Sequence, residues 1–317
     1  MKRIFSILLA LLMLLSLTAC GGGTAMTMGT GGTAGTYYGY GGVLGNQIKN
    51  AAGITVNVVS TDGSKANIIG IDEGNYQLGT VQSDVMAYAW KGTRSFEKDG
   101  KIDSFRVVGG LYAEAVQLVT MNPDIKSVAD LKGKKVSIGA AGSGVYFNAI
   151  DVLGAAGLSE TDIQPQYQSF GDSADALKDG KIDAAFIVAG APTPAIQELA
   201  TSKTAYLVPI DGDIATKLMK DSPFYTTYKI PAGTYTGQTA DVTTVTVKAT
   251  LIVSADASED DVYKLTAAIF DNADTITTAH AKGAELSIEN AVSGMEAPFH
   301  KGAAKYFAEK DVTVTAE

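Results

Sequence analysis

The chain is poor in the residues that most often carry out chemistry. Its 317 residues include one cysteine, one tryptophan and two histidines, His280 and His300. A single cysteine excludes an intramolecular disulfide, and no C-x-x-C or H-x-x-E-H spacing suggests a metal site. Neither histidine lies near a serine or cysteine in a recognisable motif. We therefore interpret both histidines as structural and expect no enzyme, no metal and no cofactor.

Positive charge is also scarce. The chain has 25 lysines and arginines against 34 acidic residues, for a net charge of −9. The absence of a basic stripe argues against nucleic acid and against a direct electrostatic contact with an anionic membrane surface. Beyond residue 20 the only arginines are Arg94, in an expected loop, and Arg106, at the start of an expected strand. Neither is well placed for a carboxylate clamp.

The N-terminus carries an export pattern. Lys2 and Arg3 precede an apolar run over residues 4–17, and the sequence "LTAC" ends this segment at Cys20. A basic start, a short apolar run and small residues are typical of a signal peptide. "LTAC" resembles a bacterial lipobox, so we expect residues 1–20 to be a lipoprotein signal peptide. Cys20 would then carry the lipid of an extracytoplasmic, membrane-anchored protein, with an ordinary secretory leader or an uncleaved anchor as the alternatives.

Beyond the leader, short β-rich runs alternate with helical patterns, which is typical of an α/β fold with mainly parallel strands. Helices are expected to start near Tyr38 and Ser64, to follow Ser143, and to cover residues 173–178 and 258–279. The expected strands are residues 26–30, 54–60, 78–82, 105–111, 116–121, 135–139, 164–167, 184–188, 205–209 and 243–254.

Four turns rich in glycine, serine and threonine each link an expected strand to an expected helix. Such turns leave unpaired N–H groups and a partial positive charge at the helix N-terminus, and ligands of open α/β sheets bind beyond the carboxyl ends of the strands. We therefore expect a small anion held by N–H and hydroxyl groups. The first turn also matches a dinucleotide spacing, but the acidic residue that a ribose requires is not at the right distance. The turns are "GTGGTAGTYYGYGG" (29–42), "STDGSKANI" (60–68), "IGAAGSGVYFNAI" (138–150) and "VAGAPTPAI" (188–196).

These turns and their flanks resemble the TAXI-type solute receptors of TRAP transporters. The resemblance covers about residues 26–312 and is carried by "GTGGTAGTYY", "STDGSKANIIGIDEGNYQLGTVQSDV", "SVADLKGKKVSIGAAGSGV", "FYTTYKIPAGTYTGQTADVTTVTVKATLIVS" and "APFHKGAAKYFAEKDV". It implies an α/β, two-lobed class II periplasmic-binding-protein fold with a ligand cleft between the lobes. Lobe one would comprise residues 25–112 plus 243–317 and lobe two residues 121–238, with hinge crossings at 113–120 and 239–242.

The resemblance further implies a receptor that captures a glutamate-like compound or a C5 dicarboxylate and delivers it to TRAP membrane permease subunits. After the Gly-Ser-Gly turn, where relatives carry an acidic or amide residue, this chain has Val145, Tyr146 and Phe147, which predicts a more apolar cleft. Two alternatives remain open, an ABC-type organic-anion binding protein and an exported enzyme on the same fold. The ligand-binding residues implied by the resemblance are Gly32, Thr33, Thr36, Tyr37, Ser64, Asn67, Gln82, Ser83, Ser143, Gly144, Val145, Gly190, Ala191 and Thr193.

Overall fold

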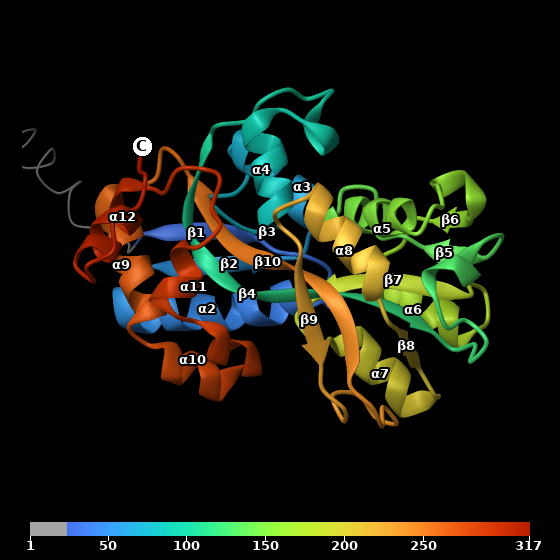
Figure 1. Cartoon of the computed structure of the whole chain (residues 1–317). Helices are drawn as coiled ribbons and strands as arrows, with labels where there is room; N and C mark the ends of the chain where they lie inside the picture. The colour runs from blue at the N-terminus through green and yellow to red at the C-terminus, as the bar shows by residue number, and fades with distance from the viewer. Residues whose placement is uncertain (1–23) are drawn as a thin grey trace, which may run out of the picture.

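The computed structural model describes residues 24–317, so the expected signal peptide and Cys20 lie outside the described residues. Within this range the strands form one sheet, in the order β2-β1-β3-β10-β4-β7-β5-β6, with β8 paired to β4 and β9 paired to β10. Two lobes lie at opposite ends of this sheet, and two long strands run between them (Figure 1). No helix within residues 24–317 is long and apolar enough to cross a membrane.

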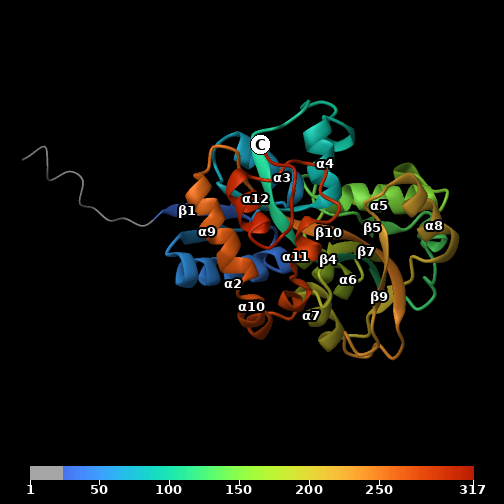
Figure 2. The same cartoon turned by 60° about the vertical axis from the view of Figure 1, so that its left-hand side comes forward.

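The first lobe combines the two ends of the described chain. Its parallel strands are β1 (Ala25–Gly29), β2 (Thr55–Val59) and β3 (Leu78–Gln82). The helices α9 and α12 pack against each other at the outer side of this lobe (Figure 2). The helical elements are α2 (Thr36–Ala52), α3 (Ser64–Asp72), α4 (Ser83–Lys91), η2 (Arg94–Phe96), α9 (Glu259–Phe270), α10 (Ala273–Ala279), η5 (Ala281–Glu285), α11 (Ile288–Val292) and α12 (Lys301–Ala308).

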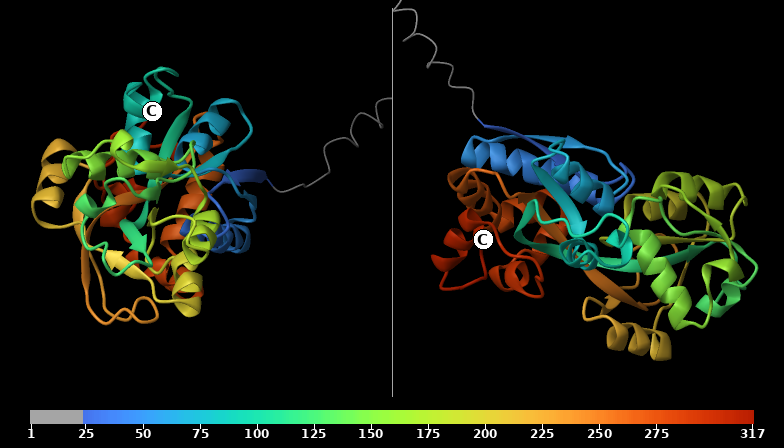
Figure 3. Two further views of the ribbon diagram at one scale, coloured as in Figure 1. Left: turned by 90° about the vertical axis from the view of Figure 1, so that its right-hand side faces the viewer. Right: turned by 90° about the horizontal axis from the view of Figure 1, so that it is seen from above.

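The second lobe is made by the central part of the chain and lies at the other end when the molecule is seen from above (Figure 3). In this lobe β5 pairs in parallel with β6 and with β7. Its strands are β5 (Lys135–Ser137), β6 (Gln164–Gln166), β7 (Ala184–Ala189), β8 (Tyr206–Val208) and β9 (Thr226–Ile230). Its helical elements are η3 (Val128–Leu131), α5 (Gly144–Ala155), η4 (Glu160–Asp162), α6 (Phe170–Lys178), α7 (Pro194–Ser202) and α8 (Gly212–Asp221).

The lobes are joined by the antiparallel strands β4 (Phe105–Thr120) and β10 (Val242–Ser254). The sequence predicted two strands, at 105–111 and 116–121, where the structure has the single strand β4. The ladder between β4 and β10 shifts register where Lys248 pairs with Ala113 and Thr250 pairs with Gly110. Two steps along β10 therefore correspond to three along β4, which places a β-bulge in β4 between the lobes.

Each lobe buries its own apolar core. Along β4, Tyr112 is the last residue in the core of the first lobe, and Ala115 already belongs to a core of the second lobe. Along β10, Val247 belongs to a core of the second lobe and Ala249 to the core of the first lobe. The change on β4 falls inside the expected crossing at 113–120. The change on β10 comes later than the expected crossing at 239–242, because residues 242–246 are part of the strand and pair with β9. The division into moving units remains a proposal.

Two helix predictions need correction. The periodic segment 258–279 is two helices, α9 and α10, separated by Asp271 and Asn272. The helix expected over 173–178 begins earlier, at Phe170, because the Ser169 hydroxyl caps it by accepting a hydrogen bond from the Asp172 amide.

Candidate functional site

A cavity of about 80 Å³ lies between the two lobes. This volume is several times the roughly 10–15 Å³ that a cavity needs to hold one water molecule, so the space suits a small solute. The first lobe contributes the turns before α2 and α3, the end of β3 and the middle of β4. The second lobe contributes the turns before α5 and α6 and the end of β7. The cavity is therefore built from the carboxyl ends of strands and from helix N-termini.

Many of the residues expected in the cleft lie around this one cavity. Two of the helices that point at it, α2 and α3, are capped by Gly35 and Gly63 without any side-chain hydrogen bond, which leaves first-turn N–H groups for a ligand. In α3 the Ala66 amide is already engaged, because it donates to the Gly142 carbonyl of the second lobe at 3.3 Å. Gly63 has a φ of 102°, a conformation that favours glycine. The expected residues that line the cavity are Gly32, Thr36, Tyr37, Ser64, Gln82, Ser143, Gly144 and Val145.

Three expected residues lie away from the cavity wall. The Asn67 amide is fully buried, and its Nδ2 donates to the carbonyls of Thr30 and Thr80 at 2.6 and 2.8 Å, so it ties α3 to the sheet. The Ser83 hydroxyl accepts a hydrogen bond from the Lys248 amide and lines a groove on another side of the strands. Thr33 is exposed and lines a shallower groove beside the cavity.

The fourth turn contributes contacts between the lobes. The Gly190 carbonyl accepts hydrogen bonds from the hydroxyls of Thr36 and Thr193, both at 2.9 Å. Thr193 is fully buried and also accepts a hydrogen bond from the Gln117 side chain at 2.9 Å. Neither Gly190, Ala191 nor Thr193 lines the cavity, whose wall here is formed by the end of β7. These residues join elements that the cavity separates, so their hydroxyl and carbonyl groups are already engaged.

Glu114 is the main cavity residue that the sequence reasoning missed. It lies on β4 and is 2% exposed, and its Oε2 accepts a hydrogen bond of 2.6 Å from the Tyr37 hydroxyl. Burial raises the pKa of Glu114 to about 8, against the lowering effect of the hydrogen bond from Tyr37. Glu114 is the single charged residue in the largely apolar run from Leu111 to Val119, and this was the available signal, because acidic residues are rarely buried without a partner.

Other missed residues extend the polar lining. Gln168, Ser169 and Phe170 come from the turn before α6, and Asp62 comes from the turn before α3. The Oε1 atoms of Gln82 and Gln168 are buried without a hydrogen-bond partner, and Gln82 is only 2% exposed. The cavity therefore carries two carboxylates and two amides, and no lysine, arginine or histidine stands among its lining residues.

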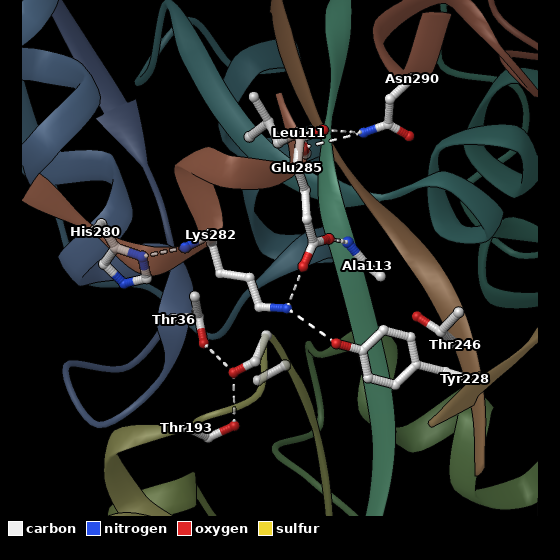
Figure 4. A network of polar contacts seen from close by, with 12 residues as sticks. Thr36, Leu111, Ala113, Thr193, Tyr228, Thr246, His280, Lys282, Glu285 and Asn290 are labelled. Carbon is white, nitrogen blue, oxygen red and sulfur yellow. Dashed lines mark hydrogen bonds and ion pairs between the residues drawn. The ribbon is translucent and has the colours of Figure 1, made fainter. Parts of the chain in front are cut away.

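The lobes also touch beside the cavity. The Lys282 ammonium, on η5 of the first lobe, donates to the Glu285 carboxylate at 2.6 Å and to the hydroxyl of Tyr228, on β9 of the second lobe, at 3.4 Å (Figure 4). The other oxygen of Glu285 accepts from the Ala113 amide of β4 (Figure 4). Lys282 is thus engaged by its own neighbours, which leaves the Glu114 carboxyl without a paired cation.

Arg94 joins the two lobes, whereas Arg106 and the two histidines serve local structure. Arg94 pairs with Asp151 on α5, and the Arg106 guanidinium donates to the Asp103 carbonyl at 2.7 Å. His280 accepts a hydrogen bond from the Lys282 amide, and His300 caps α12 by accepting one from the Gly302 amide. As expected from the sequence, neither arginine lines the cavity.

Two α/β lobes, two long connecting strands and a small polar cavity between the lobes define the two-lobed fold of periplasmic binding proteins. A family model described as the NMT1-like family matches residues 28–310, and the chain belongs to that family. Solved structures support the fold. The alkanesulfonate-binding protein SsuA of Xanthomonas axonopodis pv. citri is 17% identical with a TM-score of 0.51, over 91% of each chain. The predicted class II periplasmic-binding-protein fold is therefore confirmed.

Two further structures have the same fold. A protein of Bordetella bronchiseptica RB50 is 18% identical with a TM-score of 0.55, over 90% of this chain and 89% of the other. A Listeria monocytogenes protein described as an L-cystine ABC transporter is 18% identical with a TM-score of 0.52, over 83% and 98%. A curated Escherichia coli (strain K12) protein, named for binding aliphatic sulfonates, is 45% identical over 69 residues, which are 22% of this chain and 21% of that protein.

Proposed function

We propose that the protein is an extracytoplasmic receptor that captures a small solute and passes it to a membrane transporter. The observation that carries this proposal is the cavity enclosed by both lobes and faced by the N-termini of α2, α3, α5 and α6. A solute in such a cavity contacts both lobes at once, so its binding favours the closed arrangement over the open one. The transport proteins among its structural neighbours support the same conclusion, and neither this fold nor this cavity calls for an enzyme.

The transporter has two candidate types. The relatives described above are named for sulfonate binding and for an ABC transporter, which favours an ABC-type receptor for an organic anion. The resemblance of the sequence to TAXI-type receptors supports the TRAP-type alternative. The permease encoded next to this gene, and its co-purification with the receptor after cross-linking, would distinguish the two.

The ligand in this proposal carries at least one anionic group. N–H groups at helix N-termini interact well with negative charge, and each hydrogen bond to a charged group contributes about 1.5–3 kcal/mol. Three to five such bonds supply the roughly 8 kcal/mol that micromolar binding requires. No arginine is needed, in keeping with a cavity lined by Gly32, Ser64, Ser143 and Gly144. A glutamate-like compound, a C5 dicarboxylate and a short sulfonate all fit this description.

Ligand binding should raise the melting temperature of protein that lacks residues 1–20, because a ligand that binds only the folded state stabilises it. At 100 times the dissociation constant the gain is about 2.7 kcal/mol, or several degrees. We expect shifts within a panel of L-glutamate, glutarate, 2-oxoglutarate, taurine and ethanesulfonate, measured by differential scanning fluorimetry. Glucose and putrescine serve as controls without an anionic group. Shifts with the controls alone, or with nothing at all, would contradict the proposed function.

The membrane association in this proposal depends on Cys20, which lies outside the described residues. If residues 17–20 are a lipobox, full-length protein should partition into the detergent phase of a Triton X-114 extract, and a Cys20→Ser variant should not be processed normally. Cys20 is the single cysteine of the chain, so the substitution removes the only thiol that could be lipidated. Equal partitioning and identical processing of both proteins would show that the anchor is not a lipid on Cys20.

A further inference from the structure

The cavity holds more acceptors than a purely anionic ligand could use. Glu114 presents a buried carboxyl group whose Oε2 already accepts from Tyr37, and Asp62 adds a second carboxyl group. Gln82 and Gln168 each have a buried Oε1 atom without a partner. A buried acceptor that remains unpaired costs about 1–3 kcal/mol, so a ligand that fills the cavity gains by donating to these atoms.

A dicarboxylate would fill this cavity poorly. One of its carboxylates can lie at the helix N-termini, but the other is an acceptor only, so it cannot donate to the unpaired Oε1 atoms of Gln82 and Gln168. It would also face the Asp62 carboxylate with no lining cation between them. The nearby ammonium of Lys282 does not solve this problem, because it donates to Glu285 at 2.6 Å and is itself 3% exposed.

We propose that the ligand is a small zwitterion whose amino group binds at Glu114, while its carboxylate or sulfonate binds at the helix N-termini. Tyr37 positions the carboxyl group by donating to one oxygen, which leaves the other oxygen for the ammonium. This inference rests on the proposed function and narrows its ligand class. Glu114 is thereby a specificity-determining residue, because it separates an amino acid or aminosulfonate from the same anion without an amino group.

Proton balance provides a test that needs no variant. Burial raises the pKa of Glu114 to about 8, so in the free protein at pH 7 this carboxyl group is mostly protonated. An ammonium group beside it favours the ionised form, so binding lowers the pKa and releases up to about one proton to the solvent. The titratable and charged groups that face Glu114 are Tyr37 on α2, Asp62 before α3, Asp84 on α4, Tyr112 on β4 and Lys282 on η5.

The experiment compares two matched pairs of ligands, β-alanine with propionate and taurine with ethanesulfonate, by calorimetry at pH 7 in buffers of different ionisation enthalpy. Carboxylate and sulfonate are thus tested separately. In at least one pair, the ligand with the amino group should bind at least tenfold more tightly than the ligand without it, and its binding should release protons. Its affinity should increase as the pH is raised from 6 to 8. Propionate or ethanesulfonate binding as tightly as its amino counterpart, or binding with proton uptake, would overturn the zwitterion inference while leaving the receptor function intact.

Two variants then test which lining carboxyl group binds the amino group of the ligand. Glu114→Gln keeps the shape and an acceptor for Tyr37, so it should weaken the zwitterion about 10- to 100-fold and abolish proton release, as expected for the loss of a hydrogen bond between charged groups. Asp62→Asn changes the other lining carboxylate, which is exposed, and should have the smaller effect. If Asp62→Asn weakens binding more than Glu114→Gln does, the assignment to Glu114 is wrong. If Glu114→Gln does not fold, the number of protons that the wild type releases on binding still tests the assignment.

Discussion

Replacing Gly144 by alanine should hold the lobes apart and weaken ligand binding more than tenfold, although each lobe stays folded. Gly144 is the first residue of α5 in the second lobe. A Cβ atom there would lie 1.8 Å from the Gln82 Oε1 and 2.9 Å from the Val85 Cγ2, both in the first lobe. The Gln82 side chain can rotate away, but Val85 is fully buried and cannot. The clash is therefore relieved by opening the cleft.

Small-angle scattering and calorimetry measure this effect. With the preferred ligand at saturation for the wild type, Gly144→Ala should keep a larger radius of gyration. Gly154→Ala is the matched control, because Gly154 lies on the same helix and a Cβ atom there would meet nothing within 4 Å. That control should gain about 0.5–1 kcal/mol of stability and bind normally. If Gly144→Ala binds and closes like the control, the contact between Gly144 and the first lobe does not limit closure.

The second prediction with a large expected effect concerns how the free energy of unfolding depends on pH. Burial raises the pKa of Glu114 from 4.5 to about 8 and that of Asp84 from 3.8 to about 6. The folded protein therefore keeps protons that the unfolded chain has already released. The stability that these protons provide is complete below the unfolded pKa values and is lost as the pH rises through the folded ones. For Glu114 the loss should amount to a few kcal/mol between pH 5 and 8.

Urea unfolding of the ligand-free protein at pH 5 and pH 8 tests this expectation. Burial lowers the pKa of both His280 and His300, which makes stability rise with pH over part of the same range. The informative quantity is therefore the difference between the wild type and Glu114→Gln, since the histidines are common to both. The variant should gain stability relative to the wild type as the pH increases. Parallel pH profiles would show that Glu114 has an ordinary pKa in the folded protein.

The regular elements were predicted best where local sequence determines them. Strand β3 has the predicted bounds, and α3 and α5 begin where Ser64 and Ser143 predict a helix start. The short strand β9 was missed because "TTYKI" has only five residues, of which two are apolar, so its alternation is too brief to stand out. β4 was divided because a change of lobe was expected within it, whereas the structure makes that change inside a continuous strand.

The cavity was predicted only in part, for a physical reason. Glycine and serine turns before helices are visible in the sequence. Three of the four expected turns line the cavity with their glycine and hydroxyl residues, whereas the fourth contributes only Val188 and Ala189 at the end of β7. Which side chains then turn inward depends on tertiary packing. Thr193 satisfies its hydroxyl within the protein, whereas Glu114 from the middle of a strand reaches the cavity. A signal based on helix starts could not find a residue on a strand.

The bulge in β4 affects how the two lobes face each other. Gly110 pairs with Thr250 and Ala113 with Lys248, so two residues of β4 lie opposite one residue of β10. Such a bulge bends its strand and increases the local twist. A homologous chain that is one residue shorter there, with a regular ladder, would keep Glu114 opposite the same residue of β10 and on the same face, but would lack this bend between the lobes. The relative orientation of the two halves of the cavity can thus change through the length of one strand, with no substitution at any lining position.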